Sequence, residues 1–527
     1  MKFLTNFFLY STTSIVFLTI INFFYKIIHF QNFELENTII KSILLTFILN
    51  TTIAVIVLYS SFLVSIFLYK KKENDYLKFF ISFPHISFAI GILFFFSSSG
   101  FLQRVLNLFR QDDIPISNYL ENFEYSILYI FSLTVRELPF MVMLGLSSLN
   151  KIKTKQLLVN SKNLKLNDFN CYNLIVFPIW LKQMYLPLII IISFTYSNLE
   201  YSYILGTQFP ELLNQVIVNY WGKYFYLDDA RIYNLTIFIV ISLIMSLLTL
   251  YCIDKTRGIV FWNLRKFLPN LNLIFVGKTL YWLVNITFFI NIATLIIYSF
   301  TNNWYYPDLL PKNFTYSNYY QILLLGLDSF MFSIIISFTL SIGVFFIIFI
   351  FFMNSNSTLD KFIRKLFLVT IILILIIPQN IFMISYNSLI NIFNINNIFF
   401  PYIISLYLYI IPYVYYILKE RLENEYFNKL MISRVNHKLT NYKFLSKVIY
   451  PIYKDVFWFS IMIGFSVCYY QFIQSVIIGN GKYTLFNNEV MTLFSGESIH
   501  LASAGAIINL LPCLILFMFY KKSDVRT

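Results

Sequence analysis

The stretch NSKNLKLNDFNCYNLIVFP, Asn160–Pro178, is polar and basic, although it lies between two long apolar runs. A second stretch, SRVNHKLTNYKFLSKVIYP, Ser433–Pro451, follows in the later part of the chain and aligns with it without a gap. We call the number of sequence positions from Asn160 to Ser433 the repeat offset. Two residues are called equivalent when this offset separates them.

Other residues recur at the same distance. Four of the nineteen aligned positions are identical, namely Asn163/Asn436, Lys165/Lys438, Leu166/Leu439 and Pro178/Pro451. The repeat offset also pairs Leu138-Pro139 with Ile411-Pro412, and Gly206 with Gly479. Recurrence at a fixed distance indicates an internal repeat. We therefore interpret the chain as two related halves, 1–258 and 259–527.

The composition places both halves in a membrane. Of the 527 residues, 58% are hydrophobic and only 12% are charged, and the mean hydropathy is +0.70; these values exclude an ordinary soluble globule. Runs long enough to cross about 30 Å of hydrocarbon occur at 7–25, 43–69, 79–98, 124–148, 183–205, 232–253, 275–300, 320–353, 364–386, 395–418, 455–478 and 499–520. Continuous runs of this kind predict helices rather than a barrel. The predicted fold is an all-α, polytopic membrane protein of about twelve transmembrane helices in two parallel six-helix repeats.

The positive charge follows the predicted topology. Most of the 39 Lys and Arg residues fall in alternate connecting segments, which predicts that both termini are cytoplasmic. The formal net charge of +14 then reflects topology and contact with anionic lipid, and we expect no nucleic-acid partner. The four cysteines and four histidines are scattered singly. Their spacing predicts no metal site, no disulfide framework and no catalytic triad.

The two polar segments carry a specific resemblance. Lys165 precedes Pro178 by thirteen residues, and Lys438 precedes Pro451 by thirteen. This spacing resembles the cytoplasmic motif of the membrane subunits of binding-protein-dependent ABC importers, in which Glu-Ala-Ala is followed by Gly and, thirteen residues after that Gly, by Pro. Here Val159-Asn160-Ser161 and Ile432-Ser433-Arg434 stand in place of Glu-Ala-Ala, and Lys stands in place of Gly. Two fused six-helix halves resemble the permeases of the thiamine and ferric-iron importer group, and Gly479–Pro512 is similar to the C-terminal part of one subgroup of it.

The resemblance implies a function and a set of partners. It implies the fold of type I ABC importer permeases (MetI-like), a multi-pass location in the inner membrane of a bacterium, and transport by alternating access. It also implies a periplasmic or secreted solute-binding protein and two cytoplasmic ATPase subunits that bind ATP and Mg, so this chain would bind no cofactor and would not be an enzyme. In such permeases a surface helix of each half lies in a groove of an ATPase subunit. Mapped onto this chain, the coupling residues are Asn160, Ser161, Leu164, Lys165, Leu166, Pro178, Ser433, Arg434, Lys438, Leu439 and Pro451.

The sequence itself agrees that a motor would have to be separate, because it contains no Gly-x-x-x-x-Gly-Lys-Ser/Thr loop. Apolar residues at mixed helical spacing predict a short surface helix in Lys155–Phe169 and another in Lys429–Tyr442. The simpler alternative is that both segments are basic anchors beside the membrane.

Charges inside apolar runs mark candidate positions on a translocation path, because they are costly in lipid. Arg136 and Glu137 precede Pro139, where we expect the helix to break; the alternative is a local ion pair near the interface. Glu200, Tyr201 and Asp228-Asp229 could contact a cationic solute or a binding protein, or could be ordinary solvated residues.

Two rival functions remain at this stage. One is a twelve-helix secondary transporter driven by an ion gradient, although few acidic residues lie within the apolar runs. The other is a membrane-bound transferase, which would need clustered Asp, Glu or His near an interface. The solute is not specified by the sequence, and thiamine, ferric iron, polyamine and other small solutes all stay open.

Overall fold

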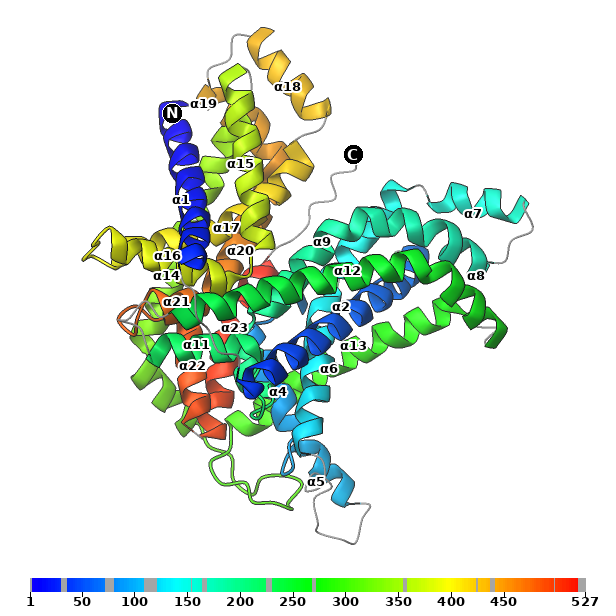
Figure 1. The fold of residues 1–527 in the computed structure, drawn as a ribbon, viewed down its shortest axis with the longest axis vertical. Coiled ribbons are helices and arrows are strands. Elements are labelled where there is room, and N and C mark those ends of the chain that lie inside the picture. The colour runs from blue at the N-terminus through cyan, green and yellow to red at the C-terminus, as the bar shows by residue number, and fades with distance from the viewer. Residues whose placement is uncertain are drawn as a thin grey trace. The chain divides into compact units, whose positions relative to one another are not determined.

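The computed structural model describes residues 2–29, 36–71, 80–108, 121–152, 154–163, 168–223, 230–267, 272–353, 358–422, 425–436, 441–496 and 498–519. Within these ranges all regular secondary structure is helical (Figure 1). The expected all-α class is therefore confirmed. The chain divides into two compact units. Unit 1 comprises Met1–Tyr25, Gln321–Ser495 and Ile508–Thr527, and unit 2 comprises Lys26–Tyr320 with Gly496–Ile507.

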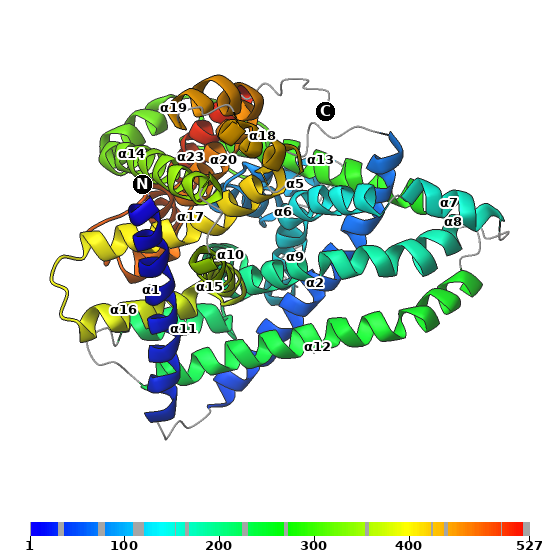
Figure 2. The same cartoon turned by 90° about the horizontal axis from the view of Figure 1, so that it is seen from above.

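Unit 2 is built around the long helix α2. In chain order it contains α2 (Asn37–Lys71), α4 (His85–Phe96), α5 (Phe101–Asn107), α6 (Glu121–Lys151), α7 (Thr154–Asn163), α8 (Asp168–Asn170), the π-helix η2 (Cys171–Val176), α9 (Phe177–Ser197), α10 (Leu199–Leu205), α11 (Leu213–Lys223), α12 (Ala230–Phe267) and α13 (Leu273–Ser299). Helix α2 packs against α6, α9, α12 and α13, and it lies between α12 and α13 (Figures 1 and 2). Its buried hydroxyl groups donate to the chain's own carbonyls, as from Ser61 to Leu58 and from Ser65 to Phe62. These polar side chains therefore need no partner from outside the helix.

Unit 1 has a similar inventory of helices. It contains most of α14 (Ser317–Met353), then α15 (Thr358–Ile376), α16 (Gln379–Ile392), α17 (Phe399–Leu422), α18 (Glu425–Asn436), α19 (Asn441–Phe444), the π-helix η3 (Leu445–Ile449), α20 (Tyr450–Tyr469), α21 (Ile473–Ile477) and α22 (Phe486–Ser495). Helix α17 packs against both α15 and α20. Besides α14, two further helices are divided between the units, α1 (Lys2–His29) and α23 (Ile499–Phe519).

The number of membrane spans agrees with the sequence-based prediction. Among the described residues, eleven helices are long and apolar enough to cross a membrane, or up to twelve if one bent pair is a single span. That pair, Arg364–Ile376 and Gln379–Ile392, bends by 114°, so the prediction of one continuous helix over 364–386 is wrong. The bend lies at Pro378, which is the N-cap of α16 and has φ −54° and ψ 134°. A proline restricts the residue before it to extended conformations, and α15 ends accordingly.

Two predicted spans are displaced toward the N-terminus. The runs expected at 183–205 and 455–478 are spans over Cys171–Ser197 and Leu445–Tyr469, each followed by a separate short helix. Pro178 and Pro451 lie in the first turn of α9 and α20. The helix is continuous through each of these prolines, because a π-helical turn, η2 or η3, precedes it. The apolar run therefore extends through each proline.

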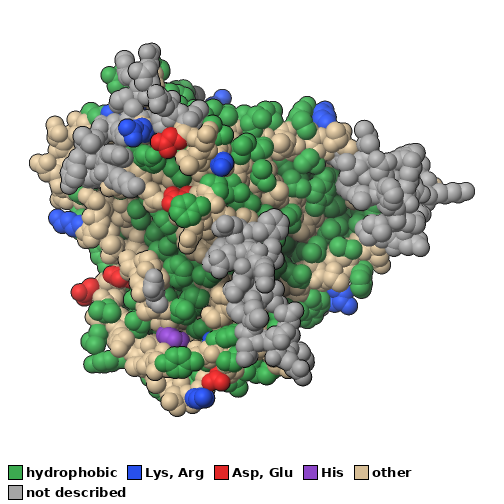
Figure 3. Space-filling model, turned by 60° about the horizontal axis from the view of Figure 1, so that its bottom comes forward, with side chains coloured by type: hydrophobic (Ala, Val, Ile, Leu, Met, Phe, Trp, Pro, Cys, Tyr) green, Lys and Arg blue, Asp and Glu red, His purple; other side chains and the backbone are tan. Residues whose placement is uncertain are grey.

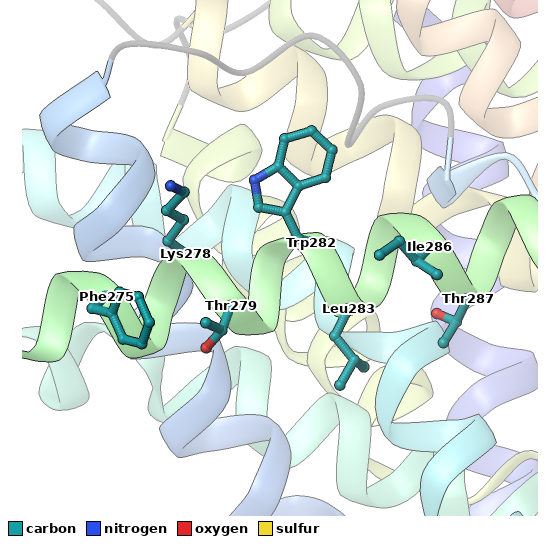
Figure 4. A pocket seen from close by; sticks show the side chains of 7 residues that line it. All are labelled: Phe275, Lys278, Thr279, Trp282, Leu283, Ile286 and Thr287. Atoms are coloured by element: carbon teal, nitrogen blue, oxygen red, sulfur yellow. The ribbon is translucent and has the colours of Figure 1, made fainter.

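The outer faces of the long helices are apolar. Large exposed hydrophobic side chains follow one face of α13, where Phe275, Trp282, Ile286 and Phe289 are all more than half exposed. Figure 3 shows one face of the molecule, on which hydrophobic side chains are extensive and charged ones are isolated. A hollow on α13 is lined by seven residues of that single helix (Figure 4). It is a shallow indentation of an apolar surface that suits lipid chains, so we do not treat it as an enclosed site.

The bounds of several elements recur along the chain at the repeat offset. Helices α8 and α19 begin at equivalent residues, as do α9 and α20, and α11 and α22. Between them lie the π-helices η2 and η3 and the short helices α10 and α21, in the same order. Helix α7 ends at Asn163 and α18 at Asn436, which are also equivalent. The same succession of short and long elements is therefore present twice.

Candidate functional site

Helix α6 carries the two charges that the sequence placed inside an apolar run. It continues from Glu121 to Lys151 through Pro139, and α17 continues through Pro412. The expected break at Pro139 is therefore wrong. A proline inside a membrane helix is tolerated when neighbouring groups satisfy the carbonyl that it leaves without a donor. The charges of α6 consequently lie on a continuous helix.

Arg136 is buried and holds a turn of the backbone. Its side chain is 5% exposed, and its guanidinium donates to the carbonyl oxygens of Ile81 at 3.2 Å and Phe83 at 2.6 Å. These carbonyls precede Pro84, the N-cap of α4, which has no side-chain cap. Arg136 thus supplies donors to the carbonyls in front of α4, and its charge is solvated by backbone dipoles.

Glu137 faces the first residue of α4. Its side chain is 7% exposed, and Oε1 lies 3.9 Å from Nδ1 of His85. This distance permits an electrostatic interaction but is too long for a hydrogen bond. Among the described residues neither atom has a hydrogen-bond partner. Orphaned polar atoms are rare in folded interiors because they cost free energy.

Tyr201 approaches the same place from α10. The chain breaks at Asn198, whose side-chain oxygen accepts the backbone N–H of Tyr201 at 3.1 Å and so starts the new helix. The Tyr201 ring lies 6.2 Å, centroid to centroid, from the His85 ring, which also packs on Phe194 at 4.9 Å. Burial raises the pKa of the Tyr201 hydroxyl well above its usual range, with Arg136 acting in the opposite direction. That hydroxyl is a neutral group without a hydrogen-bond partner among the described residues.

We call His85, Arg136, Glu137 and Tyr201 the polar cluster. Three of them were predicted from sequence as path residues, and the fourth predicted one, Glu200, is also buried and acts electrostatically on Tyr201. His85 was missed, although its place directly after Pro84 in an apolar run was a usable signal. The cluster combines donors, acceptors and a histidine–carboxylate pair in an apolar bundle. Its atoms without hydrogen-bond partners could bind a polar group, and its histidine–carboxylate pair could exchange a proton.

Unit 1 has uncharged residues at the equivalent sequence positions. Tyr409 is equivalent to Arg136, and Gln474 is equivalent to Tyr201. Both are buried, and the Tyr409 hydroxyl and both amide atoms of Gln474 have no hydrogen-bond partner among the described residues. The Tyr409 ring lies 6.1 Å from that of Phe382 on α16. Each unit therefore contains buried polar atoms without hydrogen-bond partners. Only unit 2 has a charged residue at these equivalent positions, namely Arg136.

The start of α16 resembles the start of α4. Gln379 directly follows Pro378, as His85 directly follows Pro84. The Gln379 amide donates to the side-chain oxygen of Gln471 at 2.5 Å. Unit 1 thus places an amide pair where unit 2 places a histidine.

The first predicted coupling segment forms a helix that packs at the end of a span. Helix α7 contacts α6 and η2, and Figures 1 and 2 show it beyond the end of α9. Thr154 and Ser161 are buried, and their hydroxyls donate to the carbonyls of Leu149 and Leu158. Val159, by contrast, is 61% exposed.

The second predicted coupling segment is also helical. In α18 the Ser433 hydroxyl donates to Leu430 at 2.7 Å. Phe427 is buried against Tyr453 of α20, with ring centroids 5.8 Å apart. Ile432, which is equivalent to Val159, is likewise 61% exposed. Both helices therefore pair a buried face with an exposed apolar residue at the same position.

Several of the residues predicted from sequence lie outside the described part of the chain. Outside the described residues lie Leu164, Lys165, Leu166, Asp228, Asp229, Lys438 and Leu439. The side chains of Asn160 and Arg434 also lie outside the described part, although their backbones belong to α7 and α18. Pro178 and Pro451 are in the first turns of α9 and α20.

Neither family models nor curated proteins match the chain. A scan against protein-family models finds none that matches the chain, and a search of curated proteins finds no similar sequence. Within the described ranges, no three His, Cys, Asp or Glu side chains lie close enough together to hold a metal ion.

Proposed function

We propose that this chain is the transmembrane permease subunit of an ATP-driven ABC importer, built from two parallel repeats of the type I fold in a bacterial inner membrane. The observation that carries the proposal is the recurrence of one arrangement at the repeat offset, namely a surface helix, a π-turn and a span with proline in its first turn. Two equivalent surface helices in one chain are what a pair of identical motor subunits would require.

The exposed faces of α7 and α18 support this role. Each is a mainly polar helix on which one apolar residue, Val159 or Ile432, is 61% exposed. Recognition of a helix in a groove depends on a few apolar anchors that become buried on binding. Both residues are suited to this because a β-branched side chain has little rotamer freedom to lose in a helix. ATP and Mg would bind to the motor subunits, and a solute-binding protein would deliver the solute from outside.

The polar cluster is the proposed translocation path of unit 2. A solute in transit would satisfy the orphaned atoms of Glu137, His85 and Tyr201. The class of the solute stays open among thiamine, ferric iron, polyamine and other small polar molecules.

A secondary transporter is the second candidate, and one specific observation favours it. Glu137 is buried, and His85, 19% exposed, lies beside it; the two could carry a proton, as ionisable residues within membrane spans often do in transporters.

Energised uptake distinguishes the two functions. Cells that carry the chain would be loaded with labelled candidate solutes after either ATP depletion or collapse of the proton gradient. We expect ATP depletion to abolish uptake while an ionophore, with ATP maintained, leaves it intact. Uptake that survives ATP depletion and is lost with the ionophore would overturn the importer proposal in favour of the secondary transporter.

A further inference from the structure

The surface segment with α7 and α8 joins the span α9 through one turn of π-helix, η2. The surface segment with α18 and α19 joins the span α20 in the same way, through η3. We call these turns the π-turns. In unit 2 the N–H of Phe177 donates to the carbonyl of Tyr172, five residues back. In unit 1 the N–H of Tyr450 donates to the carbonyl of Leu445, again five residues back. These two bonds join equivalent residues of the sequence repeat. A π-helix is rare and occurs mostly as single turns at functional positions, so two at one position of a repeat need a common cause.

A proline follows each π-turn and contributes to it, although a proline alone is not sufficient, since Pro139 and Pro412 lie inside α-helices. Pro178 and Pro451 come directly after Phe177 and Tyr450. A proline has no N–H, and its ring pushes away the carbonyl of the residue four positions earlier. Widening the preceding turn removes that clash, and the bonds of the π-turn replace some of the α-helical bonds that are lost. Each proline thus helps to fix one surplus residue at the junction.

The π-turns closely follow the surface helices α7 and α18 in the chain, so a movement of either helix would act on the π-turn after it. Helix α7 contacts η2 directly, and Cys171, the first residue of η2, is completely buried. In unit 1 η3 is continuous with α19 before it and with α20 after it. Helix α18 reaches α20 through Phe427 and Tyr453. A force on either surface helix therefore acts next to a π-turn and not on a regular α-helical turn.

We propose that η2 and η3 are paired hinges at which the surface segments move relative to the spans α9 and α20. In a π-turn one residue is in excess of the α-helical count. When that surplus residue moves along the helix, the segment before it rotates by roughly 100° and shifts by about 1.5 Å per residue, the geometry of one α-helical step. The spans themselves stay helical during this motion. The link from the hinge to a motor rests on the proposed function; the existence of the hinge does not.

The first experiment tests the hinge in the purified chain. In Pro178→Ala/Pro451→Ala the restored N–H groups allow ordinary α-helical bonding. We expect amide hydrogen exchange over 171–177 and 444–450 to slow by about fivefold, as the gain of roughly one net backbone hydrogen bond implies. The control is Pro187→Ala, in the interior of α9, where unit 1 has Ser460 at the equivalent position. It should leave exchange at both π-turns unchanged. Unaltered exchange in the double variant, with the control also unaltered, would overturn the hinge.

The second experiment tests what the hinge does. The double variant would be purified with its ATPase subunits and compared with the parent chain and Pro187→Ala. We expect the same yield of assembled complex and sustained ATP hydrolysis, but uptake reduced at least about tenfold, since a stiff junction cannot pass on the movement of the motor. Normal uptake by a double variant whose exchange has slowed would contradict the hinge while leaving the importer proposal intact. Failure of the parent chain to assemble with an ATPase would instead contradict the importer proposal.

Discussion

Arg136 shows how one buried charge is made tolerable in an apolar bundle. It donates to two backbone carbonyls in front of Pro84, where no helical N–H is available. Breaking such an arrangement by removing one partner is expensive, because the remaining groups are left buried and unpaired. The equivalent residue in unit 1, Tyr409, has a hydroxyl that makes no hydrogen bond among the described residues. The two positions therefore differ in what they contribute to stability.

Arg136→Ala should lower the stability of the chain by on the order of 3 kcal/mol, because the carbonyls of Ile81 and Phe83 lose their donor and Glu137 loses a nearby cation. The thermal unfolding midpoint of the detergent-purified protein measures the loss. The matched control is Tyr409→Phe, which removes a hydroxyl that stabilises nothing and should leave the midpoint within about 2 °C. Equal midpoints for Arg136→Ala and the parent chain would refute this assignment.

Glu137→Gln keeps the shape of the side chain but removes its charge. If Glu137 binds the solute or carries a proton, uptake should fall by more than about tenfold. A tenfold loss corresponds to a rise of roughly 1.4 kcal/mol in the free-energy barrier to transport. Assembly with the motor should not change, because Glu137 is far along α6 from its contact with α7. Uptake at the parental rate would return Glu137 to a purely structural role.

At the scale of elements, the short helices α10 and α21 depend on close packing at their ends. Gly206 is the C-cap of α10, and a Cβ there would overlap the carbonyl oxygen of Ser202. Gly479 follows α21, and a Cβ there would overlap the carbonyl oxygens of Ser475 and Tyr483. The close backbone therefore explains why both Gly206 and its equivalent Gly479 lack a side chain.

Gly206→Ala and Gly479→Ala should each destabilise the chain by about 1–3 kcal/mol, the usual cost of overpacking. The control is Gly222→Ala in α11, where a Cβ meets nothing within 4 Å; a helical alanine there should be neutral or slightly stabilising. Thermal midpoints again provide the comparison. A Gly206→Ala midpoint at or above that of Gly222→Ala would show that the backbone relaxes without cost.

The sequence predicted the elements whose cause is local and missed those whose cause is a neighbour. Long apolar runs predicted the spans, and fixed spacing predicted helices near Lys155 and Lys429. The 114° bend at Pro378 was missed, while a break was expected at Pro139, which lies inside a continuous helix. A proline is present in all these runs. Whether it is accompanied by a bend, a π-turn or an uninterrupted helix depends on the packing around it. His85 was missed because its partners, Glu137 and Tyr201, are distant in the sequence.

At the scale of the whole molecule, each compact unit includes a first helix from the other predicted half. In unit 1, Asn22 of α1 donates to the carbonyl of Ser385, and the Ser385 hydroxyl donates to Thr19. In unit 2, Asn291 of α13 donates to the carbonyl of Phe88. Buried amide and hydroxyl bonds between helices are favourable in lipid, where no water competes. The halves read from the sequence and the compact units of the structure therefore assign these two helices differently.

This difference predicts how the chain behaves when it is divided. Fragments 1–267 and 268–527, expressed separately, should each be unstable, because each lacks the helix that completes its compact unit. Co-expressed, they should purify together as one complex. Recovery of either fragment alone as a monodisperse protein, with a thermal midpoint near that of the intact chain, would contradict the reciprocal arrangement.

The number of ATPase subunits bound per chain tests most directly whether α7 and α18 together hold two motor subunits, as proposed. Native mass spectrometry of the purified complex should show two ATPase copies on the parent chain and none on Val159→Asp/Ile432→Asp, which places a charge at both exposed apolar positions. The control, Gln156→Ala/Lys429→Ala, changes exposed polar residues at equivalent positions of the same two helices, and should retain both copies. Two bound copies on the double Asp variant, or no ATPase on the parent chain, would contradict the account.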